Sequence, residues 1–305
     1  MSSVATASRA PVASAGTLHA REVTLDATHL GELRRTEPDR DPTDLQRRLA
    51  DDGYLYLPGF HDTDHVRAVR ADVGARFAAD GLLEPGPLPD RLVATESLRS
   101  STVRAGIARA SSALTGLLYG GRMVSLHEAL LGEPIVHFTY TWLRVVPPGL
   151  GTAPHGDGVF MNRGSQRLRT TWTPLVDTSF DLGGLIILEG SHRLPEITDD
   201  YGRRDVDTFC RNTGETPGSW DGALSHDPAE LRDRLGGRWL TADFRAGDVI
   251  VFGMFTVHGS LDNTSDQVRM STDSRYQPAS EPTDERWIGP EPIAHGPDAK
   301  KGLIC

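Results

Sequence analysis

The chain has 305 residues, enough for one large domain or two small ones, and a globular composition with 38% hydrophobic and 24% charged residues. Its net charge is −10 with acidic and basic residues mixed, which argues against nucleic acid and anionic membranes as partners because both attract basic surfaces. With only two cysteines, Cys210 and Cys305, and no apolar run of 18 residues, the sequence predicts a cytoplasmic protein without disulfides or a membrane span.

The first 130 residues are predicted to be mainly helical. Residues 1–20 begin with a small, polar stretch without the apolar core of a secretion signal, and we expect a disordered arm there, followed by a single domain over 21–305. Helices are expected over 26–35, from Asp41-Pro42 to Gly53, and over 63–79, 100–118 and 122–131. A short strand, Tyr54–Leu57, and a loop rich in proline and glycine, Leu82–Asp90, interrupt them.

After Gly132 the pattern changes to short strands rich in β-branched and aromatic residues. They are expected over 135–146, around His155, and over 168–176, 184–188, 249–258 and 268–276. Because no helices alternate with them, they indicate a sandwich or barrel, with its core over about 134–279. The exception is Ile197–Leu240, a long polar excursion that we interpret as a lid or binding loop.

One segment of this β-rich part, Gly151–Arg163, contains the only His-x-Asp of the chain. In a strand, His155 and Asp157 would lie on one face and could occupy two adjacent positions on a divalent metal. The best third ligand is His258, at the end of an apolar run near the C-terminus. Two histidines and one carboxylate leave three positions open, which is the arrangement of non-haem Fe(II) oxygenases.

A further candidate is Arg269, eleven residues after His258 on the following predicted strand. An arginine inside an apolar barrel is costly unless a carboxylate meets it, and a dicarboxylate co-substrate would do so. Ser271, on the same strand face, could bind the same carboxylate. Each residue alone has an ordinary alternative, because a strand-end histidine is often a core residue and a strand arginine usually faces solvent. Their combination is more specific.

At these residues the chain resembles the phytanoyl-CoA dioxygenase-like Fe(II)/2-oxoglutarate oxygenases, from about Tyr140 to Ala279. The segments that carry the resemblance are HGD at His155–Asp157, TTWTPLVD at Thr170–Asp177, GGLIILEGSHR at Gly183–Arg193, AGDVIVFGMFTVHGS at Ala246–Ser260 and RMSTDSRYQ at Arg269–Gln277. The resemblance implies a double-stranded β-helix, or jelly roll, buttressed by N-terminal helices.

The resemblance also implies roles for individual residues. His155, Asp157 and His258 match the iron ligands, and Arg269 matches the arginine that pairs with the distal carboxylate of 2-oxoglutarate. Further co-substrate contacts are expected at Ser260, Trp172 and, for the other end of 2-oxoglutarate, Thr141 or Arg144. The implied reaction consumes O2 and 2-oxoglutarate, releases succinate and CO2, and oxidises a substrate at the iron.

The retained carboxylate of Asp157 favours oxidation over halogenation, since related halogenases have a small residue there. We expect hydroxylation of a small-molecule, natural-product intermediate. Candidate substrate contacts, chosen for their nearness to the ligands in sequence or their place in the excursion, are Phe160, Met161, Asn162, Arg163, Tyr201 and Arg204. Two alternatives stay open: the same site could catalyse desaturation, epimerisation or cyclisation, or the protein could be a jelly roll that binds a metal or ligand without catalysis.

Overall fold

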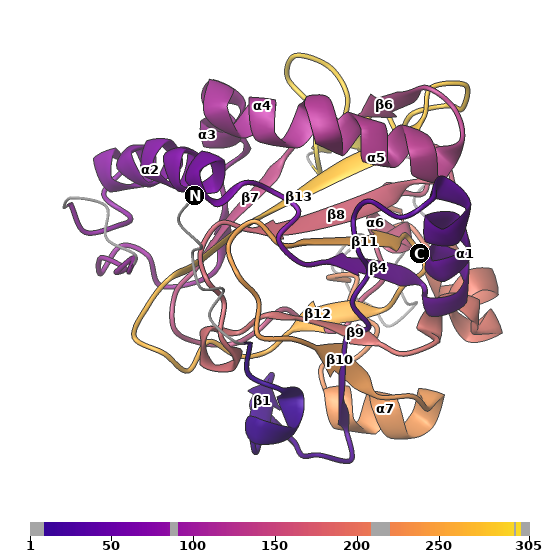
Figure 1. Cartoon of the computed structure of the whole chain (residues 1–305), viewed down its shortest axis with the longest axis horizontal. Helices are drawn as coiled ribbons and strands as arrows, with labels where there is room; N and C mark the ends of the chain where they lie inside the picture. Colours follow the sequence, from indigo (N-terminus) through magenta and orange to yellow (C-terminus); the bar gives the residue numbers. More distant parts are fainter. Residues whose placement is uncertain (1–8, 86–90, 209–219, 296, 300–305) are drawn as a thin grey trace.

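Two β-sheets face each other in the computed structural model, which describes residues 9–85, 91–208, 220–295 and 297–299 (Figure 1). The larger sheet has the strand order β4 (Tyr54–Leu57), β11 (Val249–Gly253), β8 (Arg169–Pro174), β13 (Arg269–Pro278), β7 (Trp142–Val146), β5 (Thr102–Val103), and β6 (Ile135–His137) also pairs with β13. The smaller sheet has the order β12 (His258–Ser260), β9 (Leu185–Leu188), β10 (Trp239–Thr241), β3 (Leu30–Glu32). This is the predicted jelly-roll architecture, as two facing sheets and not a closed barrel.

The core between the sheets is built by alternation along the strands. On β11, Ile250 and Phe252 face inward and pack against Leu185 and Ile187 of the smaller sheet. Val249 and Val251 of β11 point to the opposite face, where they join a cluster under the helices. Because both faces of the larger sheet are covered, its central strands are apolar on both sides.

Helices cover the outer face of the larger sheet, as Figure 1 shows above β7, β8 and β13. They are α1 (Pro42–Asp52), α2 (Thr63–Ala79), α3 (Ala105–Ala110), α4 (Ser112–Tyr119) and α5 (Gly121–Leu131). Helix α1 begins as predicted, with the Asp41 carboxylate accepting from the Thr43 N–H, and ends at Gly53 in the left-handed conformation. The prediction of one helix over 100–118 was wrong, because Ser111 ends α3 and caps α4.

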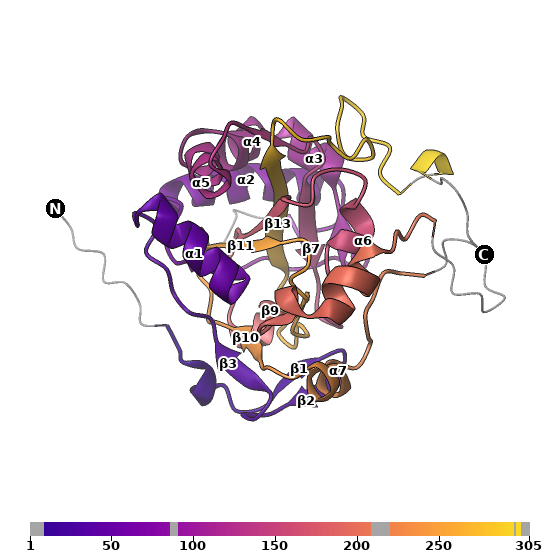
Figure 2. The same ribbon diagram turned by 90° about the vertical axis from the view of Figure 1, so that its right-hand side faces the viewer.

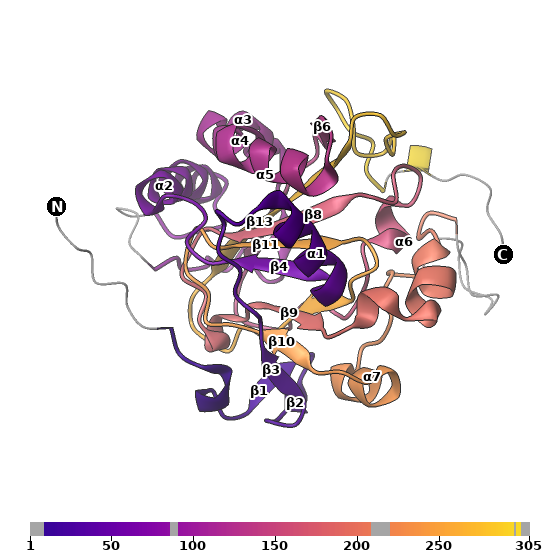
Figure 3. The ribbon, with the colours of Figure 1, turned by 45° about the vertical axis from the view of Figure 1, so that its right-hand side comes forward.

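The N-terminal region differs most from the prediction. The disordered arm expected over 1–20 is wrong for residues 9–20: Arg9 pairs with buried Asp248, and β1 (Leu18–Ala20) forms a hairpin with β2 (Val23–Leu25). The hairpin lies beside β3 and α7 (Pro228–Leu235) in Figures 2 and 3. The helix expected over 26–35 was also wrong, since β3 is a strand that pairs in parallel with β10. Residues 1–8 lie outside the described residues.

Three predicted strands were corrected. The stretch 135–146 forms two strands, β6 and β7, and 249–258 is divided between β11 and β12. The strand expected around His155 is a single bridge to His258, after which Asp157 begins the short helix α6 (Gly158–Met161). Cys210 and Cys305, which are predicted to form no disulfide, lie outside the described residues.

The expected lid over Ile197–Leu240 contains a π-helical turn, Glu196–Asp200, a 3-10 turn, Tyr201–Arg203, and α7. Residues 209–219 of this excursion are outside the described part of the chain. Within the described ranges, none of the helices combines the length and the apolar character needed to cross a membrane.

Candidate active site

The two histidines of the predicted triad are brought together by a backbone pair. The N–H of His155 donates to the His258 carbonyl (2.9 Å), and the N–H of His258 donates to the His155 carbonyl (2.8 Å). Residues paired in this way hold their side chains next to each other on one face of the sheet. The two ring centroids are 4.3 Å apart. The chain before His155 can run this close to β12 because Gly259 has no side chain: a Cβ there would lie 2.7 Å from the Thr152 carbonyl.

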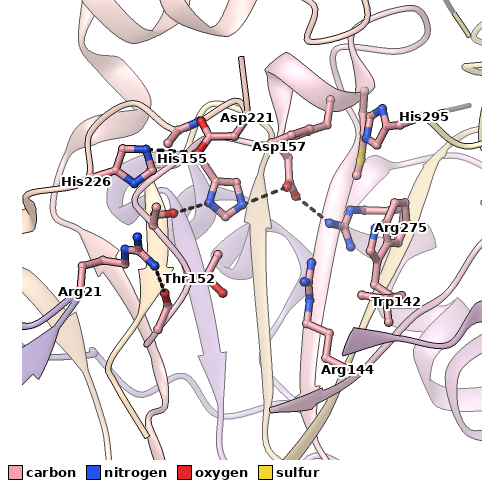
Figure 4. Close-up of a pocket in the computed structure, with 16 residues that line it drawn as sticks. Arg21, Trp142, Arg144, Thr152, His155, Asp157, Asp221, His226, Arg275 and His295 are labelled. Carbon is pink, nitrogen blue, oxygen red and sulfur yellow. Dashed lines mark hydrogen bonds and ion pairs between the residues drawn. The ribbon is translucent and has the colours of Figure 1, made fainter. Parts of the chain in front are cut away.

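The carboxylate is positioned by a turn rather than by a strand. Asp157 has helical backbone angles at the start of α6, which turns its side chain back toward the histidines. Its Oδ1 lies 4.0 Å from Nε2 of His155 and 3.8 Å from Nε2 of His258. Its Oδ2 accepts from the Thr170 hydroxyl and from Nη2 of Arg275 at 3.1 Å. One carboxylate oxygen is therefore engaged, while the other faces the two imidazoles. Figure 4 shows Asp157 between His155 and Arg275.

Both imidazoles present the same nitrogen to the centre. Nδ1 of His155 donates to the Ala153 carbonyl (2.8 Å), and Nδ1 of His258 donates to the Thr256 carbonyl (3.0 Å). A carbonyl only accepts, so the proton of each neutral ring is on Nδ1 and the lone pair is on Nε2. The structure thus fixes the tautomer that a metal ligand needs.

The protonation states also suit a metal. Burial, followed by the neighbouring His258, lowers the pKa of the His155 imidazole to about 3, and burial lowers the pKa of His258 as well. Burial alone would raise the pKa of Asp157, but Arg275 and the two imidazoles outweigh it and keep that pKa below its ordinary value. Two neutral imidazoles and an ionised carboxylate form the donor set of a facial triad. The ligand atoms all lie within 4.8 Å of one another, so they could hold one ion.

Next to the triad lies a small internal cavity that leads to Arg269. His155, His258, Ser260, Trp172 and Arg269 all line it. The Arg269 guanidinium is buried and donates to the Gly183 carbonyl, but its Nε has no hydrogen-bond partner in the part of the chain that the structure describes. Burial, followed by the positive Arg144, lowers the pKa of Arg269 to about 10. A buried cation without a carboxylate partner suits an anionic ligand in this cavity.

Other residues on the same strand support this interpretation. Ser271 is buried, and its hydroxyl has no hydrogen-bond partner within the described residues. It lies between Arg269 and Asp273 on one face of β13, although it does not itself line the cavity. Arg144, which does line it, pairs with Asp273 at 2.6 Å. Thr141, the alternative to Arg144 for the other end of the co-substrate, is not among the residues that line the inner cavity, and its hydroxyl bonds to Tyr119 on the helix side.

A larger outer cavity of about 440 Å3 opens on the other side of His155 and Asp157 (Figure 4). Phe160 and Met161 line it, as expected for substrate contacts, together with Trp142 and Val103. This cavity therefore combines an apolar wall with direct access to two of the three candidate metal ligands.

Four expected substrate contacts do not line this cavity. Asn162 donates to the Arg204 carbonyl, Arg163 pairs with Asp205, and the Arg204 side chain pairs with Asp200. The structure thus places these three side chains outside the lining of the cavity, in contacts with neighbouring segments.

Tyr201, the fourth, is buried, and its hydroxyl accepts from the Gly156 N–H at 3.1 Å and donates to the Gly222 carbonyl at 2.5 Å. Because Gly156 lies between His155 and Asp157, Tyr201 supports the loop that carries both ligands rather than the substrate.

The sequence interpretation missed Arg275 and Arg21. Arg275 is 2% exposed, bonds to Asp157 and lies over the Trp142 ring, with its CZ atom 4.4 Å from the ring centroid. It is six residues from Arg269, so the two-residue period of a strand places both on one face, a signal that was present in the sequence. Arg21, which directly follows the arm expected over residues 1–20, lines the outer cavity and had no such signal.

Comparison with known proteins gives a family and several relatives. The family model for phytanoyl-CoA dioxygenase matches residues 49–271. The 1-deoxypentalenic acid 11-beta-hydroxylase of Streptomyces exfoliatus is 29% identical over 276 residues, which cover 85% of this chain and 89% of that protein.

Solved structures with the same fold include the epimerase SnoN in complex with Fe3+, alpha-ketoglutarate and nogalamycin RO. It is 25% identical, with a TM-score of 0.56, and the match covers 81% of this chain and 86% of that one. The carbocyclase SnoK from nogalamycin biosynthesis is 22% identical, with a TM-score of 0.57 over 84% of this chain and 90% of that one. At that identity SnoK supports the fold alone.

Proposed function

Because this chain belongs to the phytanoyl-CoA dioxygenase family of Fe(II)- and 2-oxoglutarate-dependent oxygenases, we propose that it hydroxylates a small-molecule natural-product intermediate with release of succinate and CO2. The observation that carries this proposal is the arrangement of one cavity. The two histidines of the triad and a buried, uncompensated arginine line it together. A simple metal-binding jelly roll has no need of that arginine.

In this proposal His155, His258 and Oδ1 of Asp157 hold Fe(II) on one side. The metal and 2-oxoglutarate supply the activation of O2 and the oxidising power. Arg275 and Thr170 keep Oδ2 of Asp157 occupied and so orient Oδ1 toward the metal. Burial keeps both imidazoles unprotonated and available as ligands.

The co-substrate would lie in the inner cavity. The guanidinium of Arg269 would bind its distal carboxylate with two parallel hydrogen bonds, and Ser260 and Trp172 would line its path. Arg144 remains the candidate for the other end, since it lines the inner cavity while Thr141 does not. The outer cavity, lined by Phe160 and Met161, would then hold the substrate beside the open metal positions.

Hydroxylation is the outcome we favour, because the carboxylate of Asp157 occupies the place that a halide would need and a relative in sequence is a hydroxylase. The epimerase among the structural relatives supports a second candidate, the same site with a different product. Both interpretations use the same residues and co-substrate. The low cysteine count supports a cytoplasmic location.

The test is turnover of 1-deoxypentalenic acid and related polycyclic acids with Fe(II), 2-oxoglutarate and O2, measured as succinate and as product mass. We expect succinate together with a product heavier by one oxygen atom. An unchanged mass would identify epimerisation, and a loss of two hydrogens would identify desaturation or ring closure. The Arg269→Met variant should lose 2-oxoglutarate binding in calorimetry, and unaltered binding would contradict the assignment of the co-substrate site.

A further inference from the structure

Each arginine and aspartate that lines the outer cavity, except Arg21, has an ionic or histidine partner among the described residues. Arg144 pairs with Asp273, Arg275 with Asp157, Asp221 with His226 (3.2 Å), and His295 with Asp207 (2.9 Å). Arg21 also lines this cavity, but within the described ranges it has no acidic partner. Its Nη1 makes one long contact, 3.4 Å to the Gly151 carbonyl, and its buried Nε makes no hydrogen bond. Figure 4 shows Arg21 reaching toward the space in front of His155.

Arg21 is held in place by an unusual turn. It connects β1 to β2 together with Glu22, and both residues have positive φ angles, 56° and 66°, which non-glycine residues rarely adopt. The Asp262 carboxylate stabilises this turn by accepting from the N–H groups of Arg21 (2.8 Å), Glu22 (2.8 Å) and Gly151 (2.6 Å). Backbone strain of this kind persists where the surrounding structure enforces it, and here it directs a cation to the cavity.

Resting on the proposed function, we infer that Arg21 is a specificity-determining residue that binds a carboxylate of the substrate. One uncompensated guanidinium matches a group with one negative charge, and its planar donors match the two oxygens of a carboxylate. The rest of the lining offers apolar surface from Trp142, Phe160 and Met161, beside the paired arginines Arg144 and Arg275. We therefore expect a substrate with an apolar part and with a carboxylate away from the carbon to be oxidised.

This assignment concerns a part of the chain that lies outside the region matched by the family model. The family match begins at residue 49, whereas β1 and β2 end at Leu25. The metal and co-substrate residues lie inside the matched region. Arg21 should therefore affect which substrates bind and not how they are oxidised. Its loss should weaken the binding of acids and leave the iron and 2-oxoglutarate site unchanged.

The test measures binding of matched acids and amides to the anaerobic Fe(II)–2-oxoglutarate complex by calorimetry. The probes are benzoate, cyclohexanecarboxylate and adamantane-1-carboxylate, each with its primary amide, which has nearly the same shape and no charge. We expect at least one acid to bind about tenfold more tightly than its amide. In Arg21→Met that preference should disappear, and in Arg21→Lys it should be partly restored.

Two controls separate the possible failures. Glu22→Gln changes the exposed neighbour in the same turn and should keep the preference for acids. The charge-transfer absorbance of the Fe(II)–2-oxoglutarate complex, recorded on the same samples, reports the oxygenase site. If that band does not form, the proposed function fails. If it forms and no acid binds more tightly than its amide, or Arg21→Met retains the preference, the role of Arg21 is overturned.

Discussion

Arg275 touches the candidate metal centre without being one of its ligands. It is buried, and within the described residues its Nε and Nη1 have no hydrogen-bond partners. Its positive charge is therefore compensated by the carboxylate of Asp157. The two-residue period along β13 predicts Arg269, Ser271, Asp273 and Arg275 on one face. The side-chain period therefore identifies these four residues as neighbours on one face. It does not show which of them contacts the metal ligand Asp157, because the position of Asp157 depends on where α6 begins.

Arg275→Met should weaken metal binding. Without the guanidinium, Asp157 keeps only the Thr170 hydroxyl on Oδ2 and becomes free to rotate, and loss of such outer contacts typically costs about 10- to 100-fold in metal affinity. Calorimetric titration with Co(II) would measure this. Arg99→Met, at an exposed arginine, is the matched control. An affinity equal to that of the unmodified protein would show that Arg275 does not orient the carboxylate.

His127 predicts a pH dependence of stability away from the site. It is buried, donates from Nδ1 to the Met123 carbonyl, bonds through Nε2 to Thr171 and stacks on Tyr276, and burial lowers its pKa to about 3. Between pH 6.5 and about 3 the unfolded chain therefore holds a proton at this residue that the folded chain lacks. Above pH 6.5 the titration of His127 does not reduce the free energy of unfolding. Below pH 6.5 it lowers the free energy of unfolding by about 1.4 kcal/mol per pH unit.

His127→Gln should remove that part of the slope, although it lowers stability at pH 7 by removing the ring stack. Urea unfolding of both proteins from pH 7 to pH 4 measures the difference, which should shrink as the pH falls. Parallel curves would mean that His127 does not carry the titration. The metal ligands are shared by both proteins, so their own titration cancels in the comparison.

At the scale of elements, the predictions succeeded where a local pattern determines the structure. Helix α1 has its cap, its proline and its terminal glycine within thirteen residues, and β13 is a long β-branched and polar alternation. They failed where a distant partner decides. Residues 30–32 become a strand because β10 offers an edge more than two hundred residues away, and no local pattern shows that edge.

A buried carboxylate is one of the groups that attach the N-terminal segment to the larger sheet. Asp248 is fully buried and accepts from Arg9, the Tyr56 hydroxyl and the N–H groups of Gly59 and Arg245. Because four donors converge on it, this carboxylate connects β4, β11 and the start of the described chain.

Asp248→Ala should therefore destabilise the protein by about 3 kcal/mol, since it leaves buried donors unpaired. Arg9→Met should cost less, about 1 kcal/mol, because the other donors still satisfy the carboxylate. Chemical denaturation measures both values. The reverse order would contradict the central role of Asp248 and assign the stability to the arginine itself.

For the whole molecule, the ligands of the proposed centre come from two segments about a hundred residues apart. The metal should therefore stabilise the folded state against the unfolded chain, by about 2.7 kcal/mol at a concentration one hundred times its dissociation constant. Thermal unfolding with Mn(II), and then with Mn(II) and 2-oxoglutarate, should give two successive increases in Tm.

Two variants distinguish the increase in Tm caused by the metal from the increase caused by 2-oxoglutarate. His258→Ala should abolish both, while Arg269→Met should keep the first and lose the second. A second increase that survives in Arg269→Met would place the co-substrate elsewhere. The comparison needs no substrate and no turnover.

The sandwich itself followed from the sequence, because strands without intervening helices leave few alternatives. The wall of the outer cavity did not. It is assembled from the ends of elements that are remote in the chain, among them the turn at Arg21 and Glu22, which directly follows the residues whose composition predicted disorder. Composition describes what a segment could do alone, whereas Asp262 supplies the contacts that order this one.

The β1–β2 hairpin has a consequence for protein engineering. It is short and precedes the catalytic body in the chain, and both the Asp262 carboxylate and the buried side chains of Leu18, Ala20 and Leu25 hold it against that body. Grafting hairpins of different sequence onto one body, with the acceptor at position 262 retained, offers a route to enzymes that accept different molecules while performing the same oxidation. Natural diversification of such enzymes could proceed in the same way.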